Sequence, residues 1–140
     1  MAVTDFETKV AVIVRDDLAG WQRLNVCAFL MSGVSAAAGS DAIGDDYLDA
    51  DGNHYLPLLV QRVLVFEATA EKLKTVRERA QRRAVPIALY TAEMFSTGHD
   101  AANRAAVRAV SAIDLDVVGI AVRAPHRDAD AILRGLSRHR

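Results

Sequence analysis

The chain has 140 residues, of which 51% are hydrophobic and 25% are charged, and its formal net charge is -1. This length suits a single domain over residues 1–140, which would bury roughly 70% of the surface that the unfolded chain exposes. The 17 basic and 18 acidic residues nearly balance, whereas a nucleic-acid-binding surface needs clustered positive charge. We therefore do not expect a nucleic-acid partner.

Cysteine content and hydropathy bear on the compartment. Cys27 is the only cysteine, so no internal disulfide is possible, and the N-terminal residues lack the pattern of a leader peptide. Residues 24–39 lie within the longest uncharged stretch of the chain, but this stretch is too short for a bilayer and contains polar residues. We expect a cytoplasmic protein without membrane association. We interpret Cys27 as a core residue, because Arg23 is the only basic residue near it in sequence and nothing visible would lower the pKa of its thiol.

The first half of the chain predicts a strand, a helix and a hairpin. Residues 9–14 are a continuous apolar run, typical of a strand covered on both faces. Residues 21–38 predict a helix that is apolar on most sides and therefore packs against the sheet. The Asp51-Gly52 step, between flanks of alternating character, predicts a β-hairpin over residues 47–55 with a type I′ turn.

In the second half, strands alternate with helices. The predicted strands are residues 63–66, 87–90 and 117–122, and the predicted helices are residues 69–83, 98–112 and 128–136. Alternation of this kind predicts a layered α/β domain with a mostly parallel sheet.

Polar side chains crowd the segment from Thr91 to Arg104, TAEMFSTGHDAANR. Thr97 and Asp100 have the spacing of a capping box, in which each side chain accepts a hydrogen bond from the backbone N–H of the other residue. Asp100 and Arg104 are four residues apart, which predicts a surface ion pair worth only about 0.3–0.5 kcal/mol. A capped helix therefore explains part of this segment.

His99 and Asn103 have no local partner in the sequence that explains them. They are four residues apart and therefore share one face of the first helical turn. Ligands of open α/β sheets usually bind beyond the carboxyl ends of strands, where Asp16, Asp17 and Tyr90 are also expected. A helix N-terminus in that place would offer N–H groups to an anion. Two interpretations stay open, a ligand site and a merely capped helix.

The sequence predicts neither a metal nor a cofactor. The run of residues 49–53, DADGN, resembles a calcium loop, but placing Gly52 at loop position six puts Tyr47 and Leu58 at positions that need oxygen ligands. No phosphate-binding loop, no GxGxxG and no His or Cys pair with metal-ligand spacing is present in the sequence.

Three segments resemble one family. They are residues 9–33 (KVAVIVRDDLAGWQRLNVCAFLMSG), residues 47–55 (YLDADGNHY) and residues 90–106 (YTAEMFSTGHDAANRAA). In this order they resemble the bacterial family of domain of unknown function 2000, whose members are small single-domain proteins without an established activity.

That family in turn resembles, in fold, the archaeal and eukaryotic (type II) peptidyl-tRNA hydrolase. This resemblance implies a three-layer α/β/α fold with a four-stranded mixed, mostly parallel sheet, plus the small β-hairpin. The hydrolase's catalytic motifs do not carry over. Asp17-Leu18 is followed by Gly20-Trp21 instead of a glycine-lysine step, and Thr91-Ala92-Glu93 stands where the hydrolase has Asp-Ala-Gly. We therefore expect the scaffold without peptidyl-tRNA hydrolysis.

The leading hypothesis is an uncharacterised protein that binds a small-molecule ligand near the Thr97-Gly98-His99-Asp100 helix start. The candidate ligand-binding residues are Asp16, Asp17, Trp21, Asn25, Tyr90, Thr97, His99, Asp100 and Asn103.

Two alternatives remain. The first is a hydrolase of ester or amide bonds, with His99 as general base and Asp16 or Asp17 as its partner. The second is a homo-oligomeric interaction protein with an apolar surface around Met94 and Phe95. A homodimer is expected under either reading, because symmetric pairs are the commonest soluble assemblies.

Overall fold

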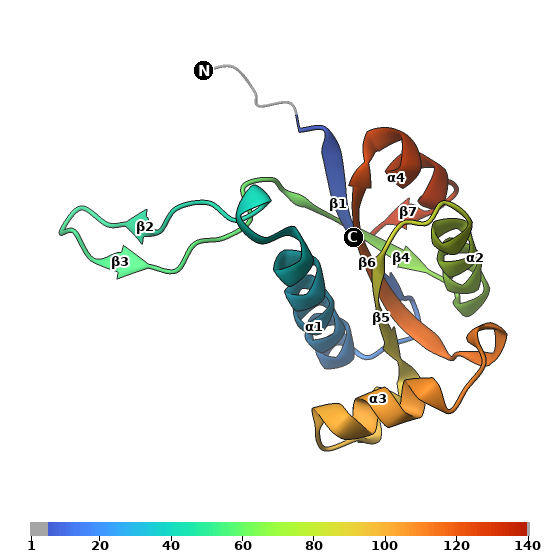
Figure 1. Ribbon diagram of the computed structural model, residues 1–140. Helices are drawn as coiled ribbons and strands as arrows, with labels where there is room; N and C mark the ends of the chain where they lie inside the picture. The colour runs from blue at the N-terminus through green and yellow to red at the C-terminus, as the bar shows by residue number, and fades with distance from the viewer. Residues whose placement is uncertain (1–5, 140) are drawn as a thin grey trace.

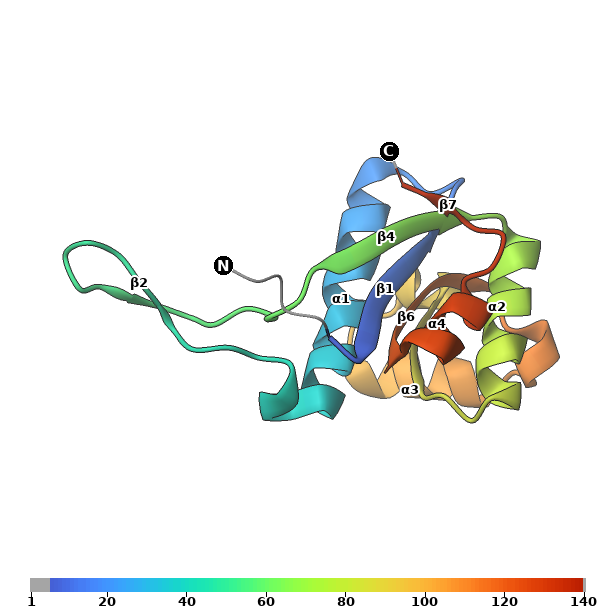
Figure 2. The same ribbon diagram turned by 90° about the horizontal axis from the view of Figure 1, so that it is seen from above.

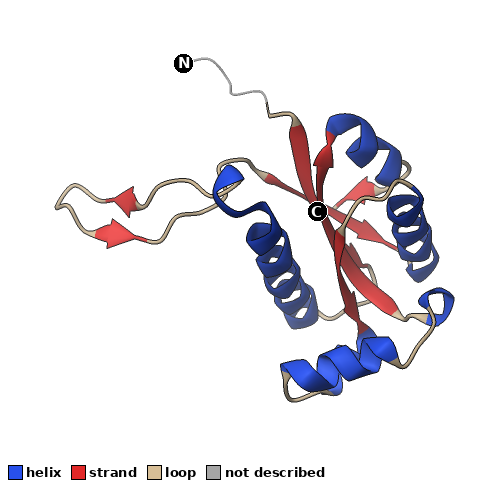
Figure 3. Ribbon diagram, viewed as in Figure 1, coloured by secondary structure: helices blue, strands red, loops and turns tan. Residues whose placement is uncertain are grey.

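We describe residues 6–139 of the chain in a computed structural model, in which they form an α/β body with one projecting hairpin (Figures 1 and 3). Within this range the strands are β1 (Thr8–Arg15), β2 (Tyr47–Leu48), β3 (His54–Tyr55), β4 (Val63–Ala68), β5 (Ile87–Thr91), β6 (Val117–Pro125) and β7 (Ser137–Arg138). The α-helices are α1 (Gly20–Ala38), α2 (Ala70–Arg82), α3 (Asp100–Arg108) and α4 (His126–Ile132), and short 3-10 helices form η1 (Gly39–Asp41), η2 (Ala92–Ser96) and η3 (Ala112–Asp114).

The central sheet has five strands in the order β5-β6-β1-β4-β7. Only β1 and β4 pair in parallel, whereas β6 is antiparallel to β1 and β5, and β7 is antiparallel to β4. The predicted mixed sheet is confirmed, but four strands and mostly parallel pairing are wrong. One reason is that α3 lies beyond the end of β5 instead of crossing a face of the sheet, so β6 returns beside β5 in the opposite direction (Figure 1).

The fifth strand comes from a segment that was expected to be helical. The helix predicted over residues 128–136 ends at Ile132, after which β7 pairs Arg138 with Phe66 and Ser137 with Glu67. Gly135, with φ of 84°, provides the reversal that brings the chain back to the sheet.

Helices cover both faces of the sheet, as the predicted three layers require. Figure 2 shows α1 on one face, with α2 and α4 on the other. Alternate residues of β1 point to opposite faces. Val10, Val12 and Val14 pack toward α1, and Ala11 and Ile13 pack toward α2 and α4. Neither α1 nor any other helix within residues 6–139 has the length and hydropathy to span a membrane.

Helix α1 approaches the sheet closely at Gly119 of β6. A Cβ placed there would lie 2.5 Å from Val26 Cγ1 and 2.9 Å from Leu30 Cδ1. Both side chains are buried and belong to α1. The absence of a side chain at Gly119 therefore fixes how near the helix sits to the sheet.

The predicted hairpin is confirmed and forms an arm, residues 43–60, that projects from the body (Figures 1 and 2). Its turn is not the predicted type I′. Gly52 N–H donates to Asp49 O at 3.1 Å, Asp49 N–H donates to Asn53 O at 3.2 Å, and Gly52 has φ of 84°. These bonds define a three-residue loop that ends in a left-handed glycine. The Asp49 carboxylate favours it by accepting the N–H groups of Asp51 and Asn53, each at 2.9 Å.

Candidate functional site

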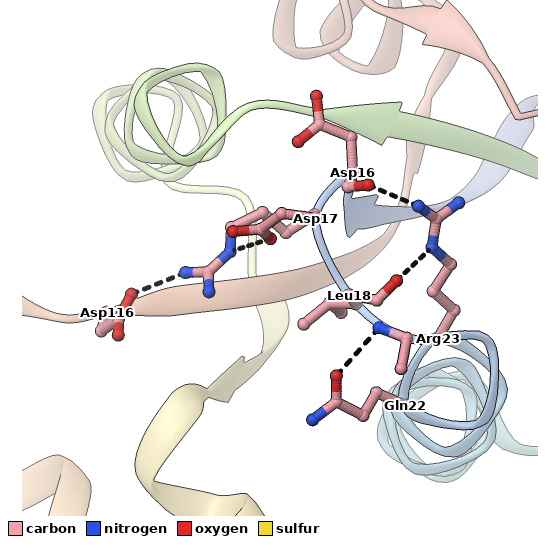
Figure 4. A network of polar contacts seen from close by, with 8 residues as sticks. Asp16, Asp17, Leu18, Gln22, Arg23 and Asp116 are labelled. Carbon is pink, nitrogen blue, oxygen red and sulfur yellow. Dashed lines mark hydrogen bonds and ion pairs between the residues drawn. The ribbon is translucent and has the colours of Figure 1, made fainter.

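The turn from β1 to α1 contains Asp16 and Asp17, and arginines hold it in place (Figure 4). Arg15 donates to the carboxylate of Asp17 at 2.6 Å and to that of Asp116 at 2.7 Å. Arg23 donates to the backbone oxygens of Asp16 and Leu18. Burial lowers the pKa of Arg15, but its hydrogen bonds to both aspartates outweigh burial and raise the pKa above its ordinary value. This network ties the turn to the sheet.

A separate cleft lies where α3 meets α1 and the end of β5. Its volume is about 450 Å³, within the usual range for small-molecule sites. The apolar lining residues are Phe29, Leu30, Leu89, Met94 and Val107, and the polar ones are Tyr90, Asp100, Asn103, Arg104 and Arg108. The cleft therefore combines an apolar wall with a charged rim.

The wall of the cleft belongs to a row of aromatic rings. The centroid of the Tyr90 ring lies 5.9 Å from that of Phe29 and 5.3 Å from that of Phe95. The ring centroids of Phe95 and Trp21 are 5.9 Å apart, in an edge-on arrangement. Tyr90 is buried, and its hydroxyl accepts a hydrogen bond from the Asn25 side chain at 3.4 Å. Packing on both sides thus fixes the position of the Tyr90 ring.

Thr97, the residue that follows η2, positions the side chain of Asn103. The Thr97 hydroxyl contacts the backbone oxygen of Met94 at 3.0 Å and the side-chain amide of Asn103. A hydroxyl has one proton and can donate to only one of these groups. If it donates to Met94, it accepts from the NH₂ group of Asn103, and the Asn103 carbonyl is left for other partners. Asn103 therefore has a local partner, contrary to the prediction.

The predicted Thr97-to-Asp100 capping box is wrong, because α3 begins later than expected. Thr97 ends η2 in an extended conformation, and His99 is the N-cap of α3. The Nδ1 atom of His99 accepts the N–H of Ala102 at 3.2 Å. This imidazole is exposed and does not line the cleft, so its local partner is the helix backbone.

Charge on the rim of the cleft comes from α3. The predicted ion pair is confirmed, since Arg104 Nε lies 2.8 Å from Asp100 Oδ2, and this hydrogen bond raises the pKa of Arg104. Arg108 is four residues further along α3 and forms no ion pair with another residue in the range 6–139. The lining therefore carries two positive charges against one negative charge.

The nine candidate residues divide into groups. Tyr90, Asp100 and Asn103 line the cleft, Asn25 and Thr97 contact those residues, and Trp21 joins the same aromatic row. His99 caps α3, whereas Asp16 and Asp17 belong to the arginine network of the β1–α1 turn.

Several lining residues were not among the sequence candidates. Arg104 and Arg108 are spaced four apart on an amphipathic helix, a signal that was available, but Arg104 was assigned only to its surface ion pair. Phe29 is 57% exposed although its helix is apolar on most sides, and nothing local in the sequence predicts that exposure.

The interpretation of Cys27 as a core residue is confirmed in part. Cys27 is half-buried and packs against the edge of the cluster between α1 and the sheet, and burial raises the pKa of its thiol. A raised pKa leaves little thiolate near neutral pH, which makes Cys27 a poor nucleophile.

Fold and cleft define a small α/β protein with a mixed five-stranded sheet. The chain belongs to the family described as protein of unknown function DUF2000, whose model matches residues 8–140. A solved structure, the protein of unknown function Atu0240 from Agrobacterium tumefaciens strain C58, is 46% identical with a TM-score of 0.94. That alignment covers 97% of this chain and 100% of the other. No curated protein matches the sequence.

Proposed function

We propose that this protein binds a small organic anion in the cleft between α1, β5 and α3. The observation that carries the proposal is the lining itself, in which the aromatic residues Phe29 and Tyr90 and the basic residues Arg104 and Arg108 border the same cleft. Arginine pairs well with carboxylate and phosphate groups, and aromatic walls favour a ring or another flat apolar part.

Each part of the cleft has a role in this proposal. Arg108 supplies a positive charge that no described acidic side chain neutralises, whereas Arg104 is already paired with Asp100. Asn103, positioned through Thr97, offers an amide to a polar group of the ligand. The aromatic row behind Tyr90 holds the wall rigid, so that little ordering of side chains is needed on binding.

Phenyl phosphate is a suitable probe, because it joins an aromatic ring to an anionic group. Calorimetric titration should give a tighter Kd for phenyl phosphate than for inorganic phosphate or phenol alone. Arg108→Gln should weaken binding by about tenfold or more, since a charge-assisted hydrogen bond contributes roughly 1.5–3 kcal/mol. Arg134→Gln is the matched control, because Arg134 is exposed and lines a different hollow beside α2.

Equal loss of affinity in Arg108→Gln and Arg134→Gln would show that the anion binds through general surface charge, and the proposal would fail. Absence of any heat with phenyl phosphate, together with absence of a bound molecule after gentle purification, would also reject it.

The hydrolase alternative has less support. No hydrogen bond or ion pair joins His99 to Asp16 or Asp17, and the Nδ1 of His99 is occupied by the helix backbone. The fold likeness to type II peptidyl-tRNA hydrolase remains a prediction from the sequence. Turnover of an acyl substrate that is lost in His99→Gln would revive this alternative.

A further inference from the structure

The arm, residues 43–60, carries an apolar surface that its own chain leaves uncovered. Six of its large apolar side chains are exposed, and they are Tyr47, Leu48, Tyr55, Leu56, Leu58 and Val60. Leu56 has 85% of its surface exposed. An isolated two-stranded hairpin is only marginally stable in water, so an arm of this composition gains from a covering surface.

The arm nevertheless has a defined conformation, because hydrogen bonds order both its turn and its base. Besides the two backbone N–H groups, the Asp49 carboxylate accepts hydrogen bonds from the Asn53 amide at 2.9 Å and the Tyr55 hydroxyl at 2.8 Å. At the base, Val60 N–H donates to Ala42 O at 2.9 Å and Gly44 N–H donates to Leu58 O at 3.1 Å. These bonds fix both ends of the arm and direct it away from its own body (Figures 1 and 2).

A second uncovered surface lies on the outer face of α1, which we define by Trp21, Leu24, Ala28, Ser32 and Ala36. All five residues are exposed, with Trp21 at 63% and Leu24 at 75%. From Leu24 to Ser40 the chain contains no charged residue. Solvent-facing helices normally place charges on such a face, so this one is built for contact with another surface.

The arm and the groove beside α1 also have complementary charge. The arm carries Asp45, Asp46, Asp49 and Asp51 without any Lys or Arg. The groove between α1 and β5 is lined by Gly33, Ala37 and Ala88 and contains Arg123. Arg123 Nε is buried without a hydrogen-bond partner among residues 6–139. An acidic arm laid over α1 would supply carboxylates close to this cation.

We infer that the protein forms a symmetric dimer by exchanging arms, with the arm of each copy lying on the outer face of α1 of the other. Each chain carries both surfaces, so two copies related by one two-fold axis can cover both arms and both α1 faces at once. Because alternate strand residues point to opposite faces, the arm presents only about half of its six exposed apolar side chains to one helix, on the order of 250 Å² per arm. Two arms and the two faces they cover then bury on the order of 1,000 Å² of side-chain surface, the lower bound for a specific interface.

Sedimentation equilibrium of the full chain tests this inference. The wild type should have twice the monomer mass of 15.2 kDa. Leu56→Glu on the arm and Leu24→Glu on α1 should each raise the dimer dissociation constant by about 30-fold or more. Neither change should disturb the fold, because both side chains are exposed. Ile113→Glu is the matched control, since Ile113 is 69% exposed in η3 and belongs to neither surface. Ile113→Glu should keep the dimer dissociation constant within about threefold of the wild-type value.

A mixing experiment distinguishes arm exchange from any other dimer. Mixing Leu56→Glu with isotopically labelled Leu24→Glu leaves one intact arm-to-helix contact in the mixed pair, so native mass spectrometry should show that pair in excess over either variant dimer. A wild-type monomer at about 100 μM would overturn the inference. A dimer that neither variant weakens would also overturn it. So would a mixed pair that is no more abundant than the dimers of the two variants.

Discussion

Adding one methyl group at Gly119 tests how closely α1 must approach the sheet. The new Cβ would lie 2.5 Å from Val26 Cγ1 and 2.9 Å from Leu30 Cδ1, well inside normal carbon contact. Both side chains are buried and belong to α1, so either they must change rotamer within a packed core or α1 must move away from the sheet. Overpacking of this kind typically costs about 1–3 kcal/mol. At about 4 °C per kcal/mol for a chain of this size, Gly119→Ala should lower Tm by about 4–12 °C.

Urea denaturation followed by circular dichroism measures this cost, and Gly98→Ala is the control. A Cβ at Gly98 meets nothing within 4 Å, so that variant should stay within about 0.5 kcal/mol of the wild type. Because Leu30 lines the cleft, Gly119→Ala should also weaken binding of phenyl phosphate. Equal stability of the two variants would refute the argument that Gly119 sets the helix position.

Three other measurements probe local features. Ala84 has φ of 54° after α2, so Ala84→Gly should raise the free energy of unfolding by about 0.5–1 kcal/mol, and a decrease would contradict the strain argument. His99→Ala should lower it by about 1 kcal/mol in the same assay while His99→Asp should not, and equal effects would exclude capping by the imidazole. Hydrogen bonds, first from the Asn53 side chain, lower the pKa of Asp49 to about 2. The hydrogen bonds to the Asp49 carboxylate add stability that is present above its unfolded pKa and is lost as the pH falls through its folded pKa. The chemical shifts of the Asn53 side-chain amide should therefore stay constant from pH 7 to about pH 4 and change between about pH 4 and 2. A change that begins above about pH 5 would count against this assignment.

Much of the fold follows from local pattern in the sequence. The apolar run of β1 and the helix α1 lie close to their predicted positions, because burial on both faces of a strand leaves a continuous apolar signature. Strand direction was harder to predict. Whether β6 returns parallel or antiparallel depends on where α3 packs, and that is a tertiary choice. The two residues of β7 were too few to give a pattern.

The candidate site was predicted in part. Tyr90 and Asn103 line the cleft, because a strand end and the following helix do meet there. The role of His99 was harder to read, since a capping histidine and a free histidine look alike in sequence. The shift of the cap from Thr97 to His99 depends on η2, whose 3-10 turn the sequence did not reveal. The aromatic row brings Trp21 beside Phe95, a contact across 74 positions that no local spacing predicts.

Native mass spectrometry of gently purified protein, repeated under denaturing conditions, tests the proposed ligand site most directly. The wild type and Arg134→Gln should carry the same extra mass, which disappears on denaturation, and Arg108→Gln should carry none. An extra mass that Arg108→Gln retains would place the ligand outside the cleft between α1, β5 and α3, and would contradict the proposal.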